Sequence, residues 1–209
     1  MKRILLNLVP LLVLGLLFSG CGKKEEAEIE PEKMEQRVIE GKKVVMVIAE
    51  KNYRDEELLD PEEVLADAGA IVSVASTTKD MVKGMGGHEV QPDLLVTDIK
   101  PEDWDAIVFV GGIGASQYWD DVFVHNLAKE FLNQGKIVGA ICIAPVTLAN
   151  AKILEGKKAT CWASEGDKLK DKGAFYTEED VVRDGNIITA SGPPAAKKFG
   201  EALVEALKE

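Results

Sequence analysis

One stretch decides how this chain folds: IVGAICIAP, residues 137–145. Its first five residues are apolar or small, as expected for a strand buried on both faces of a parallel sheet. Cys142 follows at once, and Pro145 then opens a helix, because proline is favoured at the first helical position. The stretch therefore predicts a strand, a tight turn that carries a cysteine, and a helix.

Similar apolar runs recur along the chain and predict further buried strands at residues 44–49, 71–75, 106–110 and 187–190. Helical sequence lies at residues 61–68, 121–133, 146–151 and 195–207. Strands that alternate with helices build a mainly parallel sheet covered on both sides, so we expect an α/β three-layer sandwich. Asp60-Pro61 predicts a helix start, and Asp184-Gly185-Asn186 predicts a hairpin.

The N-terminus has the three-part layout of an export signal: two basic residues, an apolar run over residues 4–18, and Ser19-Gly20-Cys21. Residues 17–21 resemble a bacterial lipobox, which predicts a lipoprotein signal over 1–21 with Cys21 as the lipidated residue. The expected location is the bacterial cell envelope, anchored by lipid at the periplasmic or extracytoplasmic face. A plain secretory signal or an uncleaved anchor is the alternative.

Residues 22–41 are rich in Glu and Lys and predict a charged tether, which leaves 42–209 as one domain. The formal charge of −11 and the absence of a basic stripe argue against nucleic-acid binding. Membrane contact is expected only through the lipid. Besides Cys21 the chain has Cys142 and Cys161, which form no zinc-ligand spacing, so we expect no metal and no cofactor. Whether these two cysteines pair stays open.

Ligands of an open parallel sheet bind at the carboxyl ends of its strands. Residues 51–57, 111–115 and 142–145 each follow a predicted strand and should share that edge. Cys142 then stands on a nucleophile elbow, where the start of a helix would lower the pKa of its thiol. The alternative is a buried, inert cysteine. Among the nearby acids, these arguments do not distinguish Glu57 from Glu56 or Asp55.

Four segments together resemble the ThiJ/PfpI family of the class I glutamine amidotransferase-like superfamily: residues 140–145, Gly111-Gly112, Asp55-x-Glu57-x-x-x-Pro61 and Ser191-Gly192-Pro193. The resemblance implies a flavodoxin-like sandwich and a homodimer or higher homo-oligomer. It implies that Cys142 is the nucleophile and that a protonated Glu57 hydrogen-bonds its thiol. Backbone N–H groups of Gly112 and Ile143 would form an oxyanion hole, and Gly111 and Trp162 would line the pocket.

The chain departs from that family at the histidine partners of the cysteine, because Ile143 and Trp162 stand at the two positions where relatives place His. His88 and His125 match neither position, so they are interpreted as surface or packing residues. Peptidase activity is therefore less favoured than action on a small electrophilic carbonyl, by a glyoxalase- or deglycase-like lyase or a hydrolase. A non-enzymatic redox sensor and a ligand-binding or stress-protection module are the alternatives.

Overall fold

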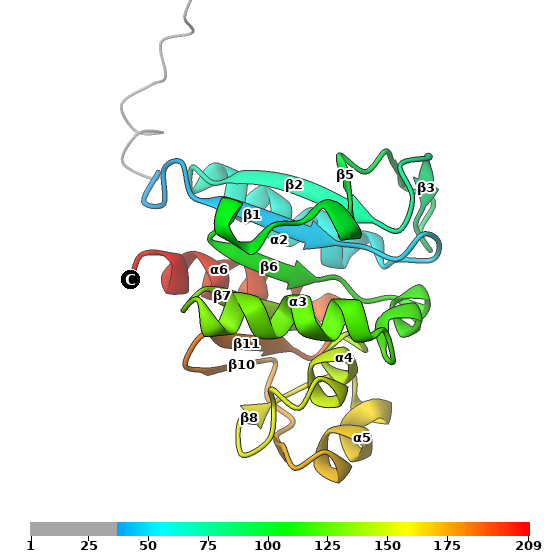
Figure 1. The fold of residues 1–209 in the computed structure, drawn as a ribbon, viewed down its shortest axis with the longest axis vertical. Helices are drawn as coiled ribbons and strands as arrows, with labels where there is room; N and C mark the ends of the chain where they lie inside the picture. The colour runs from blue at the N-terminus through cyan, green and yellow to red at the C-terminus, as the bar shows by residue number, and fades with distance from the viewer. Residues whose placement is uncertain (1–36) are drawn as a thin grey trace, which may run out of the picture.

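The central sheet has seven strands in the order β10-β11-β7-β6-β1-β2-β5 (Figure 1). A computed structural model describes residues 37–209 of the chain. All neighbouring strands of this sheet are parallel except β10 and β11. The strands are β1 (Lys43–Val47), β2 (Ile71–Ser76), β5 (Leu94–Leu95), β6 (Ala106–Phe109), β7 (Ile137–Ile141), β10 (Val181–Asp184) and β11 (Ile187–Ala190).

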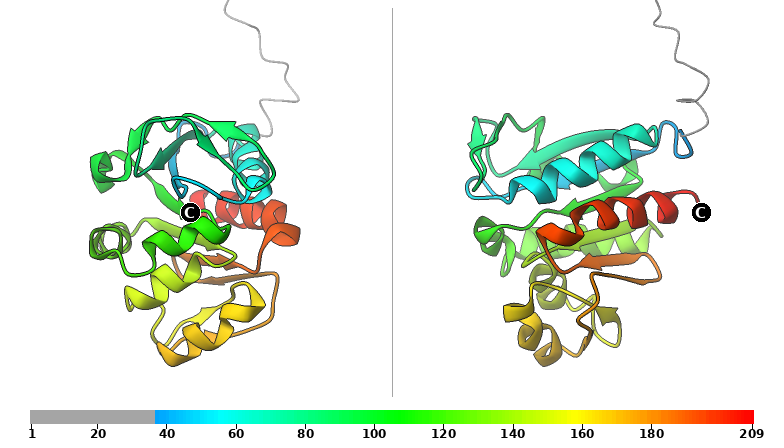
Figure 2. Two further views of the ribbon diagram at one scale, coloured as in Figure 1. Left: turned by 90° about the vertical axis from the view of Figure 1, so that its right-hand side faces the viewer. Right: turned by 180° about the vertical axis from the view of Figure 1, so that it is seen from behind.

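Helices cover both faces of the sheet, which confirms the predicted α/β three-layer sandwich (Figure 2). Helices α2 (Asp55–Asp67) and α6 (Ala196–Leu207) lie side by side on one face. Helices α3 (Val122–Asn133) and α4 (Pro145–Asn150) pack on the other face, with α5 (Gly166–Asp171) beyond α4. Each face has its own cluster of buried apolar side chains, so the sheet separates two cores.

Short elements complete the fold. Two small sheets pair β3 (Val82–Lys83) with β4 (Glu89–Val90) and β8 (Lys158–Ala159) with β9 (Phe175–Tyr176). Five short 3₁₀ helices occur in the described residues: Val96–Asp98, Pro101–Asp103, Ile113–Tyr118, Ala163–Glu165 and Pro193–Ala195. The predicted hairpin is confirmed, because Gly185-Asn186 alone joins the antiparallel strands β10 and β11.

The predicted start of the first helix is wrong. Helix α2 begins at Asp55, and Pro61 lies inside it rather than at its first position. A proline there removes the hydrogen bond from its own nitrogen to the Glu57 carbonyl and crowds that carbonyl, but three acidic residues at 55–57 favour the helix start through the helix dipole. The earlier start is what places Glu57 in the first turn of α2, at the sheet edge.

The structure tests the predicted end of the tether at residue 41, but it does not describe the predicted signal over residues 1–21. Ile39 is buried, and its N–H donates to the carbonyl of Ala68 at 3.0 Å, so the folded part already includes residues that were assigned to the tether over 22–41. The predicted lipoprotein signal, Cys21 and the rest of the tether fall outside the described residues. Within residues 37–209, none of the helices combines the length and the apolar character needed to cross a membrane.

Candidate active site

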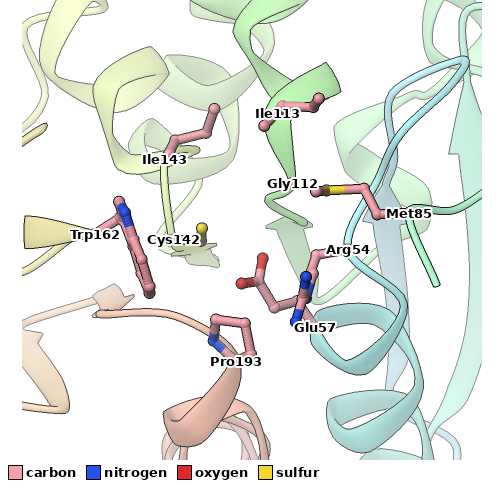
Figure 3. Close-up of a pocket in the computed structure, with 9 residues that line it drawn as sticks. All are labelled: Arg54, Glu57, Met85, Gly112, Ile113, Cys142, Ile143, Trp162 and Pro193. Carbon is pink, nitrogen blue, oxygen red and sulfur yellow. The ribbon is translucent and has the colours of Figure 1, made fainter. Parts of the chain in front are cut away.

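A cavity of about 230 Å³ opens at the carboxyl ends of the parallel strands (Figure 3). The three segments that were predicted to share this edge do meet there, and they bring Glu57, Gly112 and Cys142 together. The cavity is lined by Arg54, Glu57, Met85, Gly112, Ile113, Cys142, Ile143, Trp162 and Pro193.

Cys142 occupies the predicted strand-to-helix turn. Its backbone has φ = 64°, a left-handed conformation that is rare for a residue other than glycine and costs about 1–3 kcal/mol. Two hydrogen bonds hold the turn: Cys142 N–H donates to Ala190 O at 2.9 Å, and Trp162 N–H donates to Cys142 O at 2.8 Å. The strained turn presents the thiol to the cavity, with 8% of the residue exposed.

Glu57 faces the Cys142 thiol from the first turn of α2 (Figure 3). It is fully buried, and neither carboxyl oxygen has a hydrogen-bond partner of normal geometry within residues 37–209. Burial raises the pKa of Glu57 to about 7, although the Cys142 thiol, the Arg54 charge and the Gly111 amide oppose the shift. The family resemblance implied a protonated Glu57, and a pKa of about 7 allows both the protonated and the ionised form at neutral pH.

Gly111 and Gly112 allow these groups to approach one another. A Cβ atom on Gly111 would lie 2.5 Å from the Cys142 Cβ and would also clash with Glu57 Oε2. Gly112 has φ = 91°, and a Cβ there would lie 2.6 Å from Asn52 O. The Arg54 N–H donates to Gly111 O at 3.1 Å, which ties this loop to the start of α2. Only glycine fits at either position, so both residues shape the site.

The prediction that the Cys142 thiol has a lowered pKa is contradicted. Burial, and after it the negative charge of Glu57, raise the pKa of Cys142 to about 12. The backbone N–H groups of Gly112 and Ile143 lie at the sulfur and oppose the shift, but they do not outweigh it. The start of a short helix lowers the thiol pKa less than the loss of water around the sulfur and the neighbouring carboxylate raise it.

Trp162 forms one wall of the cavity, as predicted, and is 46% exposed. A Cβ on Gly192 would lie 2.7 Å from Trp162 Cε3, so the indole rests against the backbone that precedes α6. Its neighbour Cys161 is buried in the core on the α3 and α4 side of the sheet. Cys142 and Cys161 are both free thiols in this structure.

The two histidines lie away from the cavity, in agreement with their assignment as packing or surface residues. His88 Nδ1 is 2.8 Å from the Tyr53 hydroxyl, and His125 Nε2 is 2.8 Å from Trp119 O. Neither lines the cavity. The described part of the chain also contains no group of His, Cys, Asp and Glu side chains arranged to hold a metal.

Sequence reasoning missed a loop that reaches the cavity. The carboxylate of Asp55 accepts hydrogen bonds from Gly86 N–H at 2.6 Å and His88 N–H at 2.7 Å, so it holds residues 84–88. Burial acts to raise the pKa of Asp55, but these N–H groups hold it below its usual range. The loop places Met85 on the cavity wall. The glycines at 84, 86 and 87 were the sequence feature that could have predicted this loop.

Comparison with known proteins shows which protein family has a similar sequence. The model of the DJ-1/PfpI family matches residues 42–206. An uncharacterized protein of Methanocaldococcus jannaschii is 43% identical over 100% of this chain and 98% of its own length. A deglycase of Pyrococcus furiosus is 27% identical over 78% of this chain and 99% of its own. A glutathione-independent glyoxalase of Caenorhabditis elegans is 29% identical over 80% and 89%.

A solved structure agrees with these matches. The ThiJ/PfpI domain protein from Brachyspira murdochii superimposes with a TM-score of 0.78 and 37% sequence identity, over 80% of this chain and 97% of that one. The family match covers most of the chain and includes the elbow, the Gly111-Gly112 loop and the first turn of α2. The chain therefore belongs to the DJ-1/PfpI family.

Proposed function

We propose that this protein is a cysteine-dependent enzyme that acts on small electrophilic carbonyl compounds, with a glyoxalase- or deglycase-like reaction. One observation carries the proposal: a fully buried carboxyl, Glu57, faces the Cys142 thiol in a cavity of about 230 Å³. Relatives that are named as a deglycase and a glyoxalase support the same chemistry.

Glu57 can replace the histidine that other cysteine enzymes use as the base. Its pKa of about 7 suits an acid–base group at neutral pH, since such a group can both accept and return a proton. The Cys142 thiol is neutral at that pH because its own pKa is raised. Glu57 would therefore take the thiol proton as the sulfur attacks, so that no free thiolate has to persist.

The first step then balances without any further reagent. The sulfur forms a bond to the carbonyl carbon, the π pair moves to the oxygen, and the N–H groups of Gly112 and Ile143 stabilise the negative charge. Glu57 returns the proton to that oxygen and leaves a hemithioacetal. For methylglyoxal, Glu57 would next move the C1 proton to C2 while the proton of the C1 hydroxyl passes to the C2 oxygen. The product is a thioester, which water hydrolyses to lactate and free thiol.

The shape of the site favours small substrates over peptides. Apolar side chains of Met85, Ile113 and Trp162 surround the cysteine, and Ile143 stands where peptidase-like relatives carry histidine. Without that histidine, Glu57 is the one acid among the described residues that line the cavity, and it is fully buried, so it is poorly placed to protonate an amide leaving group. We therefore expect no hydrolysis of casein, in contrast to turnover of a small aldehyde.

The test is turnover of methylglyoxal by the full chain, followed as D- or L-lactate, with Cys142→Ser and Glu57→Ala as variants. Lactate that depends on both residues supports the proposal. Equal rates in the native protein and in Cys142→Ser would refute it. If no lactate forms but Cys142 gains oxygen under peroxide, the redox-sensor alternative takes its place.

The cellular setting is a further part of this proposal and rests on the sequence. A lipidated Cys21 would hold the enzyme at the extracytoplasmic face of a bacterial cell envelope, and a homodimer is the expected assembly. Light scattering of the purified protein in detergent measures the assembly, and a monomer at micromolar concentration would exclude the dimer.

A further inference from the structure

Arg54 contributes the one cationic side chain among the residues that line the cavity. Its companions there are apolar apart from Glu57, the thiol and a glycine. Arg54 occupies the cap position before α2, yet its side chain makes no capping hydrogen bond. A guanidinium at the mouth of a mostly apolar cavity therefore has no role in starting the helix.

The Arg54 side chain is only partly engaged by its neighbour Glu56. Arg54 Nη2 donates to Glu56 Oε1 at 3.3 Å. Arg54 Nε lies 2.8 Å from Glu56 Oε2, but the N–H is not directed at that oxygen and makes no hydrogen bond. This Nε atom is itself buried. Both side chains are more than a third exposed, and such ion pairs are weak because water screens them. A guanidinium has five N–H donors, so Arg54 can exchange this contact for a better one.

The charge of Arg54 reaches Glu57. It acts to lower the pKa of Glu57, the acid that faces the Cys142 sulfur. A ligand bound between these groups would feel the same field. The chain as a whole carries a formal charge of −11, so an anion approaches this cavity favourably only if a local cation offsets the general repulsion.

We propose that Arg54 binds a carboxylate of the substrate, so that the natural substrate is a small carbonyl compound with a carboxylate close to its reacting carbon. This inference rests on the proposed function and adds the substrate class. Guanidinium and carboxylate make paired, charge-assisted hydrogen bonds, and the substrate carboxylate would displace that of Glu56. The apolar wall of Ile113 and Trp162 then leaves room for only a short carbon chain.

Two alkylating reagents test this without any turnover. Iodoacetate and iodoacetamide differ in one group: the first carries a carboxylate and the second a neutral amide. In both reactions the Cys142 sulfur forms a bond to the CH₂ carbon and the C–I pair leaves as iodide. The ratio of their rates at Cys142, measured by mass spectrometry and divided by the same ratio for glutathione, reports how strongly the cavity prefers an anion.

Arg54→Met should lower this ratio roughly five- to tenfold, because a charge-assisted contact is lost from a partly exposed site. Arg54→Lys should keep most of the preference, and Glu56→Gln should raise it by freeing Arg54. Arg183→Met is the matched control, because it changes the net charge equally. Arg183 lies on the outermost strand β10, outside the cavity, and pairs with Glu209. An unchanged ratio in Arg54→Met, or an equal fall in Arg183→Met, would overturn the proposal.

A second measurement separates this inference from the proposed function. Acetate and acetamide are titrated into the protein while the indole N–H signal of Trp162 is followed by NMR, with Trp162→Phe to assign it. If Cys142 resists both reagents but acetate shifts the signal only when Arg54 is present, the anion site stands and the nucleophile proposal fails. If Cys142 reacts but acetate and acetamide act alike, the nucleophile stands and the Arg54 proposal fails.

Discussion

Replacing Glu57 by glutamine should lower the pKa of the Cys142 thiol. The carboxylate of Glu57 is one of the two main causes of the raised thiol pKa, after burial. Glutamine has nearly the same volume and remains a hydrogen-bond donor, but it carries no charge. The substitution thus removes the repulsion between the carboxylate and a thiolate while it leaves the burial of the sulfur in place. The family resemblance predicted the opposite direction, because it treats Glu57 only as a donor to the thiolate.

The size of the effect follows from Coulomb's law. Two unit charges about 4 Å apart interact by about 4 kcal/mol at an effective dielectric constant of 20, which corresponds to about 3 pKa units. Burial is the larger cause of the shift from 9.0 to about 12, so the charge contributes less than this limit. We expect the thiol pKa in Glu57→Gln to fall by about one to two units and to stay above that of a free cysteine.

The assay is the rate of iodoacetamide alkylation at Cys142 between about pH 6 and pH 11, read separately from Cys161 by mass spectrometry. Glu63→Gln is the matched control, since Glu63 lies on the same helix but is exposed. Faster alkylation of Glu57→Gln at pH 9, together with slower turnover of methylglyoxal, is the expected pair of results. A thiol pKa that rises in Glu57→Gln would refute the electrostatic argument and restore the donor argument.

Further predictions concern stability, packing, the loop and the anchor. The pKa of Glu57 is about 7 in the folded protein and its ordinary value is 4.5, so the stability that Glu57 contributes is fully present below about pH 4.5 and is lost as the pH rises through 7. Glu57→Gln should therefore be more stable than the native protein by about 3 kcal/mol at pH 8 in urea unfolding, and an equal gain at pH 4 would contradict this. Gly111→Ala should cost about 1–3 kcal/mol and abolish turnover, whereas Gly41→Ala, which is strained at φ = 75° but meets no atom within 4 Å, should leave turnover unchanged. Asp55→Ala should cost about 1–3 kcal/mol and expose residues 84–88 to protease, and unchanged cleavage would show that Asp55 does not hold the loop. Cys21→Ala should move the protein from the detergent phase to the aqueous phase, and equal partition of both forms would remove the lipoprotein prediction.

Local patterns in the sequence determined the architecture. The apolar runs identified the principal parallel strands β1, β2, β6, β7 and β11, because strands buried on both faces need uninterrupted apolar sequence. The same reasoning located Cys142 on its turn, since a strand, a cysteine and a proline-opened helix are neighbours along the chain. Glu57 emerged only from the family motif, because the acidic run at 55–57 offers three equivalent carboxylates to a purely local argument.

The tertiary structure decided the chemistry of these residues. Helix α2 continues through Pro61 and packs closely against Gly200 of α6, where a Cβ would lie 2.9 Å from the Pro61 Cα. The pKa values of Glu57 and Cys142 depend on how completely distant segments exclude water from both groups, which no window of sequence records. For the same reason, the sequence located the candidate cysteine, whereas only the fold placed Arg54 on the wall of the same cavity and raised the pKa of the Cys142 thiol instead of lowering it.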